Sequence, residues 1–382
     1  MSLRVLVLNW RCPTNPRAGG AESVTYELCR RLVGLGHSVE WFGASYPGAR
    51  TEEVIDGIQV VRRGKQWSVH WHAFRYYRKT LNERFDIVID ETNTVPFFTP
   101  LWTSVPSAMF IHQLAREVWW YEAPFPLSIL GFVAEPLYLR LYRSRPVITV
   151  SASTKSDLLR LGFTGPITVV PNGVEPMEET TSLKEPEPTF IYVGRLAPSK
   201  RIHHLLSALS RFRSATGQGQ LWIVGTGSKA YERRLADFAR RLYLQDAVTF
   251  LGRLGTRDKH SRMARAHALL MSSVREGWGL AVIEANACGT PAIVYDIRGL
   301  RDAVMDGVNG FVVHSDPRSM ATAMLSLAAD GDLQGRLAKS SMTFSRRYSF
   351  DESIWILISA LENLLQGGTK LDAPMDSSAL KA

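Results

Sequence analysis

Residues 268–291, ALLMSSVREGWGLAVIEANACGTP, predict a strand, a glycine-punctuated loop and a helix in immediate succession. The apolar run at the start of this stretch is the strand, and good helix formers follow Gly279. A helix that begins there exposes free backbone N–H groups and the positive end of its dipole, which suits a phosphate. Glu276 in the loop and Glu284 in the helix suit hydroxyl groups on either side of that phosphate; otherwise they are an N-terminal charge and a solvated helix residue.

The same alternation of short apolar runs and helical patterns extends along the chain and is typical of α/β proteins with parallel sheets. A chain of 382 residues favours two domains, and the polar, proline-bearing stretch 175–188 indicates a linker between them. We therefore predict two Rossmann-like domains facing a cleft, with ligands at the carboxyl ends of the strands. The expected strands are Leu3–Asn9, Val39–Phe42, Gln59–Arg62, Asp86–Asp90, Ser107–Ile111, Val147–Val150, Thr189–Val193, Gln220–Val224, Val248–Leu251, Ala268–Ser272, Pro291–Tyr295 and Gly310–Val313.

Composition indicates a protein of the cytoplasm. The cysteines Cys12, Cys29 and Cys288 lack metal-ligand spacing, which argues for a reducing compartment and against zinc or a disulfide framework. The start of the chain lacks a signal-peptide pattern, and no apolar run reaches the ~20 residues that span a bilayer. The net charge of +9 favours phosphorylated ligands, an anionic membrane or nucleic acid, or it serves solubility alone.

Two further loops after strands carry residues suited to a diphosphate. Gly19 and Gly20 follow the first strand and open a helix, where paired glycines let the backbone approach a phosphate or simply make a tight turn. Arg195 and Lys200 follow the first strand of the second half. Their cationic groups can converge on one diphosphate, or they are two solvated charges.

Taken together and in this order, these motifs resemble the family 4 glycosyltransferases, which have the GT-B architecture. The resemblance extends from about residue 3 to 366, and Pro171-Asn172-Gly173-Val174 and the segment 149–153 fit the same family. Phe350 to Leu365 has helical spacing and corresponds to the last GT-B helix. The implied division is 1–175 for an N-terminal acceptor domain, 176–188 for a linker, 189–347 for a nucleotide-sugar donor domain, 348–366 for a helix crossing back to the first domain, and 367–382 for a disordered tail.

The resemblance implies a role for each motif residue. Glu276 would contact hydroxyls of the donor sugar, and Glu284 those of the ribose. Arg195 and Lys200 would hold the diphosphate and stabilise its charge as it leaves. His112 would lie beside the transferred sugar, unless it is only a hydrogen-bonded strand-end histidine. The catalytic set is Arg195, Lys200, Glu276 and His112, and the donor-binding set is Gly19, Gly20, Arg195, Lys200, Arg253, Leu254, Glu276, Gly279, Leu280 and Glu284, with Arg253 and Leu254 near the base.

The resemblance also implies transfer of a hexose-type sugar from a nucleoside diphosphate to an acceptor hydroxyl, with retention of anomeric configuration. Arg195 and Lys200 can do what a divalent metal does in other transferases, so we expect no metal and no cofactor. Retaining glycosidases use one of two carboxylates about 5 Å apart as the nucleophile. Because Glu276 is assigned to sugar hydroxyls, we expect front-face attack, in which the leaving phosphate takes the acceptor proton. The sequence does not choose between UDP, GDP and other donors.

Two segments of the first half indicate where the acceptor binds. Residues 62–79 interleave basic and aromatic side chains, and residues 118–142 are rich in aromatic and aliphatic ones. Such composition is typical of surfaces at an anionic membrane, which would suit a lipid-linked or envelope glycan acceptor and a place at the inner face of the cell membrane. The alternative is that these side chains form core or line a pocket for a soluble acceptor.

Other functional classes fit less well. A nucleotide-sugar epimerase of the same architecture would share the diphosphate site and is the main alternative. A dinucleotide oxidoreductase would need Gly-x-Gly-x-x-Gly after the first strand, which 17–22 does not supply. A phosphorylase would need a lysine that binds pyridoxal phosphate, and no motif in the sequence indicates such a lysine. Nucleic-acid binding would explain the charge but not Glu276 and Glu284, so we expect no nucleic-acid partner.

Overall fold

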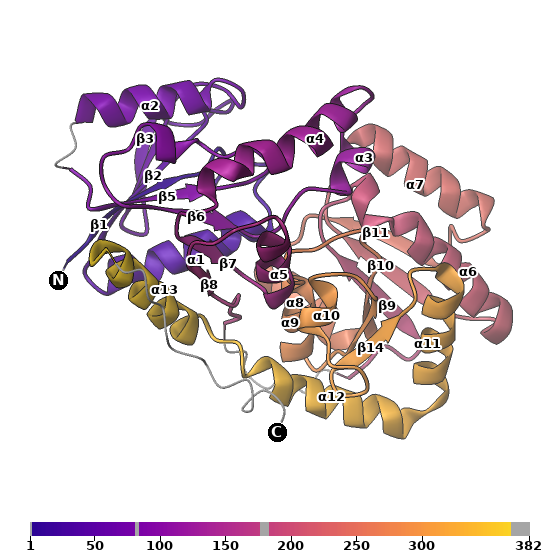
Figure 1. Cartoon of the computed structure of the whole chain (residues 1–382). Coiled ribbons are helices and arrows are strands. Elements are labelled where there is room, and N and C mark those ends of the chain that lie inside the picture. The colour runs from indigo at the N-terminus through magenta and orange to yellow at the C-terminus, as the bar shows by residue number, and fades with distance from the viewer. Residues whose placement is uncertain (1, 81–83, 176–182, 368–382) are drawn as a thin grey trace.

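The computed structural model of the chain describes residues 2–80, 84–175 and 183–367. Two α/β bodies lie next to each other, each built around one sheet (Figure 1). The last strand of the first sheet ends at Val169 and the first strand of the second begins at Thr189. The predicted α/β fold with two Rossmann-like bodies is therefore confirmed.

The first sheet, within the described residues, has the strand order β3-β4-β2-β1-β5-β6-β7-β8. Every neighbouring pair is parallel except β3 and β4, which form an antiparallel edge. The strands are β1 Arg4–Leu8, β2 Ser38–Gly43, β3 Glu52–Ile55, β4 Ile58–Arg62, β5 Ile87–Glu91, β6 Ser107–Ile111, β7 Val147–Thr149 and β8 Ile167–Val169.

The second sheet has the order β11-β10-β9-β12-β13-β14 and is parallel throughout its described strands. Its central strands β9, β10, β12 and β13 are short and almost wholly buried, as expected where helices cover both faces, whereas the edge strands β11 and β14 are partly exposed. They are β9 Thr189–Val193, β10 Gln220–Val224, β11 Val248–Gly252, β12 Ala268–Met271, β13 Ala292–Tyr295 and β14 Gly310–Val313.

Each predicted strand is found with its bounds shifted by no more than one residue. The two strands that were not predicted, β3 and β8, are the edge strands of the first sheet. β3 has no fully buried residue, and β8 is three residues long. β3 therefore leaves no apolar run by which a buried strand is recognised, whereas β8 was missed although residues 167–170 (ITVV) are as apolar as the predicted strand at 147–150 (VITV).

Helices cover both faces of the first sheet (Figure 1). α1 (Gly20–Gly34) and α13 (Phe350–Leu365) lie on one face, and α2 (Val69–Thr80) and α4 (Leu127–Leu139) lie on the other. None of the described helices combines the length and apolarity of a membrane span. The remaining helices are α3 Val118–Glu122, α5 Ala152–Arg160, α6 Ile202–Thr216, α7 Lys229–Arg241, α8 Thr256–Arg265, α9 Leu280–Ala287, α10 Leu300–Ala303, α11 Pro317–Ala329 and α12 Gly331–Ser345, with 3-10 turns η1 Thr99–Leu101, η2 Arg140–Tyr142 and η3 Pro198–Lys200.

The last helix, α13, crosses from the second body back to the first, as the sequence predicts (Figure 1). It packs against α1 and buries Leu357 and Leu361. Arg31 of α1 pairs with Asp351 at 3.0 Å and lies over the ring of Phe350. This helix therefore joins the two bodies at a second place besides the linker.

The predicted linker and tail are only partly described. Residues 176–182 and 368–382 lie outside the described residues. The described end of the linker is anchored to the second body, because the Lys184 ammonium donates to the carbonyls of Ala264, Ala266 and Gly289.

The docking of α13 gives a test of how the two bodies are joined. A Cβ added at Gly173 would overlap the backbone N of Phe350, at the start of α13. Gly173→Ala should therefore lower the free energy of unfolding by about 1–3 kcal/mol. Gly335→Ala is the matched control, because a Cβ there meets nothing within 4 Å in α12, and it should add about 0.5–1 kcal/mol. Urea denaturation measures both, and equal stability of the two variants would contradict this account of the joint.

Candidate functional site

Two helix N-termini meet between the bodies. α1 follows Gly19, whose N–H donates to the Glu22 carboxylate at 2.7 Å. α9 follows Gly279, whose φ of 94° explains the need for glycine. A Cβ added at Gly20 would lie 3.8 Å from the Leu280 side chain. The positive ends of two helices are thus brought together from opposite domains, which is the arrangement that binds an anion.

Glu276 pairs with a lysine of its own domain. Its Oε1 lies 2.6 Å from Lys200 Nζ and accepts a hydrogen bond from the Ser273 hydroxyl at 2.6 Å. Both charged side chains are mostly buried, with exposed fractions of 14% and 16%. The two residues assigned from sequence to the sugar and to the diphosphate are therefore direct neighbours.

Arg195 pairs with a carboxylate of the other domain. Its Nη2 lies 2.8 Å from Oε1 of Glu122, the last residue of α3. The same oxygen accepts a short hydrogen bond from the Ser199 hydroxyl. Glu122 was not predicted, because it lies in a segment interpreted as acceptor-binding and is 73 residues from its partner. A phosphate that approaches Arg195 has to compete with this carboxylate.

Glu284 also has a lysine partner that sequence reasoning missed. Lys259 Nζ, from α8, lies 2.8 Å from Glu284 Oε1, and both side chains are 19% exposed. No motif marks Lys259, so only the fold reveals it. Arg253 Nη1 donates to the carbonyl of Pro16, in the first domain, at 3.5 Å, while the partly buried Leu254 packs against the hydrophobic core. The region expected near the base therefore adjoins the loop before α1.

His112 follows β6 and is buried, with its ring stacked on Phe110 at a centroid distance of 4.5 Å. Its Nε2 lies 3.3 Å from Glu91 Oε1 and 3.4 Å from Thr25 Oγ1. A Cβ on Gly277 would be 2.7 Å from the His112 carbonyl oxygen. The backbone of His112 thus touches the loop of Glu276, whereas its Nε2 faces the interior of the first domain.

Arg275, next to Glu276, ties this loop to the first domain. Its Nε lies 2.7 Å from Glu117 Oε2 and its Nη1 lies 2.7 Å from Asp157 Oδ2. The Arg275 side chain is only 7% exposed. Arg298 also pairs with Asp157, at 2.6 Å. These interdomain ion pairs were not predicted, because nothing in a single sequence connects charges so far apart.

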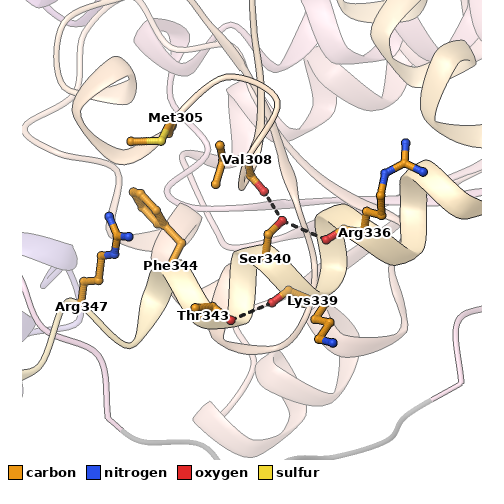
Figure 2. A pocket seen from close by; sticks show the side chains of 8 residues that line it. All are labelled: Met305, Val308, Arg336, Lys339, Ser340, Thr343, Phe344 and Arg347. Atoms are coloured by element: carbon orange, nitrogen blue, oxygen red, sulfur yellow. Dashed lines mark hydrogen bonds between the residues drawn. The ribbon is translucent and has the colours of Figure 1, made fainter. Parts of the chain in front are cut away.

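A separate hollow of about 380 Å³ lies between α12 and the loop before β14 (Figure 2). Figure 2 shows that Ser340 and Thr343 donate to carbonyls, at Arg336 and Val308 for Ser340 and at Lys339 for Thr343. None of the residues predicted for the site lines this hollow, which is formed by Met305, Val308, Arg336, Lys339, Ser340, Thr343, Phe344 and Arg347.

Comparisons with known proteins cover nearly the whole chain. The family model described as Glycosyltransferase Family 4 matches residues 18–178, and the model described as Glycosyl transferases group 1 matches residues 174–343. Glycogen synthase of Mycobacterium tuberculosis is 24% identical over 376 residues, covering 89% of each chain.

Two solved structures share the fold. Sucrose-phosphate synthase from Thermosynechococcus elongatus superposes with a TM-score of 0.83 at 19% identity, covering 96% of this chain and 100% of the other. HepE from Anabaena, in complex with UDP and glucose, has a TM-score of 0.75 at 16% identity, covering 94% and 99%. The arrangement of the two bodies is therefore the GT-B fold.

The interdomain ion pairs give a second test. Arg275→Met removes a buried cation between two carboxylates and should lower the free energy of unfolding by about 3 kcal/mol. Arg160→Met is the matched control, because Arg160 contacts the same Asp157 at 3.5 Å but is 64% exposed, and it should change stability by less than about 1 kcal/mol. Urea denaturation compares the two variants. Equal losses of unfolding free energy would show that the interdomain ion pairs of Arg275 do not stabilise the protein.

Proposed function

The chain belongs to the family 4 glycosyltransferases, and we propose that it moves a hexose-type sugar from a nucleoside diphosphate to an acceptor hydroxyl with retention of configuration. The observation that carries this proposal is the meeting of Gly20 and Leu280 at two opposed helix N-termini. A diphosphate placed there interacts with two sets of backbone N–H groups and two dipole ends. The cations Arg195 and Lys200 follow β9, and Lys200 pairs with Glu276 in the loop that leads to α9.

These groups suit the chemistry of a leaving diphosphate. As the glycosyl bond breaks, the sugar becomes oxocarbenium-like and the diphosphate gathers negative charge. Fixed amide dipoles and cations stabilise that charge more in the transition state than in the ground state. Arg195 and Lys200 would supply the positive charge at the leaving group, so the proposed reaction needs no metal and no cofactor.

The two glutamates take separate roles in this proposal. Glu276, next to Lys200, would hold hydroxyls of the transferred sugar, and Glu284, next to Lys259, those of the ribose. Both carboxylates are thus assigned to binding, and the acceptor would attack from the face that the diphosphate leaves. His112 would lie beside the sugar, since its backbone contacts the Glu276 loop at Gly277. Because HepE is described in complex with UDP and glucose, UDP-sugars are the first donors to test.

The surface of the first domain supports an acceptor held at an anionic membrane. Trp67 is 84% exposed and Trp71 is 59% exposed at the start of α2, so they are not core. Residues 62–80 contain six Lys or Arg and no acid, and five of these cations reach the surface, because Arg62 is buried against Glu53. On the same side of the domain (Figure 1), α3 and α4 in 118–142 expose a row of apolar side chains: Trp120, Leu127, Leu130, Val133 and Leu137.

This surface favours a lipid-linked or envelope glycan precursor as acceptor, reached by a cytoplasmic protein at the inner face of the membrane. Exposed Trp side chains partition to the headgroup region, and each nearby cation adds about 1 kcal/mol of attraction to anionic lipid. It also favours transfer over epimerisation, because an epimerase needs no second substrate and no surface to recruit one. A soluble acceptor would leave the exposed aromatics without a role.

A panel of nucleotide sugars, scored for nucleotide release with and without lipid extract, tests the reaction. Glu276→Gln should lower kcat by about 100-fold, because its contact strengthens in the transition state. Glu284→Gln should raise the donor KM by about tenfold with kcat nearly unchanged, because its contact is equal in both states. Turnover of no donor by the wild type would refute the proposed function, and a covalent glycosyl-enzyme adduct would refute front-face attack.

Flotation with anionic liposomes at low salt tests the membrane surface. The wild type should float with the vesicles, and the double variant Trp67→Ala/Trp71→Ala should float several-fold less, because the apolar anchors are gone. Trp355→Ala is the matched control, since Trp355 is 61% exposed but belongs to α13 on the opposite face. Absence of wild-type flotation would remove the membrane from the proposal.

A further inference from the structure

Two adjacent carboxylates end β5, and both are wholly buried. Asp90 is held by four donors: the backbone N–H groups of Phe97 and Thr99, the Thr99 hydroxyl and the Tyr142 hydroxyl, at 2.5–3.2 Å. These four hydrogen bonds satisfy the Asp90 carboxylate, so its role is structural. Glu91 points to the other face of the sheet, because successive side chains alternate along a strand.

Glu91 lacks such a set of donors. Neither of its carboxylate oxygens accepts a hydrogen bond from a backbone N–H of the described residues. The group that faces it is the His112 imidazole, whose Nε2 lies 3.3 Å from Glu91 Oε1 and 3.4 Å from the Thr25 hydroxyl. Burial raises the pKa of Glu91; the neighbouring His112 and, to a smaller extent, the Thr25 hydroxyl lower it, whereas the charge of Glu22 raises it further.

The other ionisable groups around Glu91 do not compensate its charge. Glu22 of α1 is already satisfied by Arg11 at 2.7 Å and by the Asn93 amide at 2.8 Å. Cys29 of α1 is a buried thiol whose pKa is raised by burial and by the charge of Glu91. A buried carboxylate without a cation costs several kcal/mol, so hydrophobic packing alone would favour an apolar residue at this position.

We propose that Glu91 is a positioning residue for the transfer reaction: it holds Nε2 of His112 inside the first domain and thereby fixes the ring and its tautomer. This inference rests on the proposed function, in which His112 lies beside the transferred sugar. If Nε2 keeps its proton and donates a hydrogen bond to the Glu91 carboxylate, Nδ1 is the unprotonated nitrogen. Nδ1 can then accept a hydrogen bond from a sugar or acceptor hydroxyl. The carboxylate thus acts through His112 and does not touch the substrate.

The test compares Glu91→Gln with Asp90→Asn, two isosteric changes at adjacent buried positions. Glu91→Gln should lower kcat by about 10- to 100-fold with the donor KM nearly unchanged, since the amide cannot enforce one tautomer. In ¹⁵N-histidine NMR spectra, the His112 signals, identified by their loss in His112→Gln, should change tautomer in Glu91→Gln. Asp90→Asn should lower the urea midpoint but leave the His112 signals in place.

The outcomes separate the two proposals. If Glu91→Gln keeps the wild-type kcat and the wild-type His112 tautomer, the positioning role is wrong. If the wild type releases nucleotide from no donor, the proposed function fails, and the NMR comparison still decides whether Glu91 governs His112. If Glu91→Gln is too unstable to study, Thr25→Val tests the same ring. It removes the hydroxyl 3.4 Å from Nε2 and leaves Glu91 in place, so the tautomer should stay as in the wild type; a changed tautomer would show that Thr25 and not Glu91 fixes it.

Discussion

The site depends on one loop that is bound to both domains at once. Arg275 reaches across to Glu117 and Asp157, while Glu276, the next residue, stays with Lys200 in its own domain. The close approach of Gly277 to the His112 carbonyl adds a backbone contact that no larger residue would allow. The loop therefore fixes the distance between the domains at the point where the two helix N-termini meet.

The charges of the site fall into two groups according to where their partners lie. Glu276 and Glu284 pair with lysines of the second domain, and all four side chains are at most 19% exposed. Arg195 is 53% exposed, and its partner Glu122 belongs to the first domain. In the proposed reaction, the residues that contact the sugar and the ribose are preorganised within one domain. Arg195, in contrast, would leave Glu122 and bind the diphosphate when the donor enters.

Sequence reasoning recovers what is local and loses what is distant. The buried strands and α9 leave apolar runs and glycine signals that are visible in the sequence, whereas the partly exposed edge strand β3 does not. The motif residues Gly20, Lys200 and Glu276 could be named because family 4 motifs mark them. The partners of Arg195, Glu284 and His112 could not be named. These partners, Glu122, Lys259 and Glu91, occupy unremarkable positions in the sequence, and only the folded structure makes them neighbours.

The position of Glu122 joins the acceptor side to the donor side. It ends α3, and α3 packs against α4, whose outer face carries the exposed apolar row. A force that shifts α4, such as docking at a bilayer, acts on α3 and hence on the hydrogen bonds of Glu122 to Arg195 and Ser199. Since Glu122 and the proposed diphosphate compete for the Arg195 guanidinium, a surface that recruits the acceptor would also change the affinity for the donor. In the proposed function, the apolar row on α4 and the donor-binding residues would then be coupled through Glu122, a residue of the first domain.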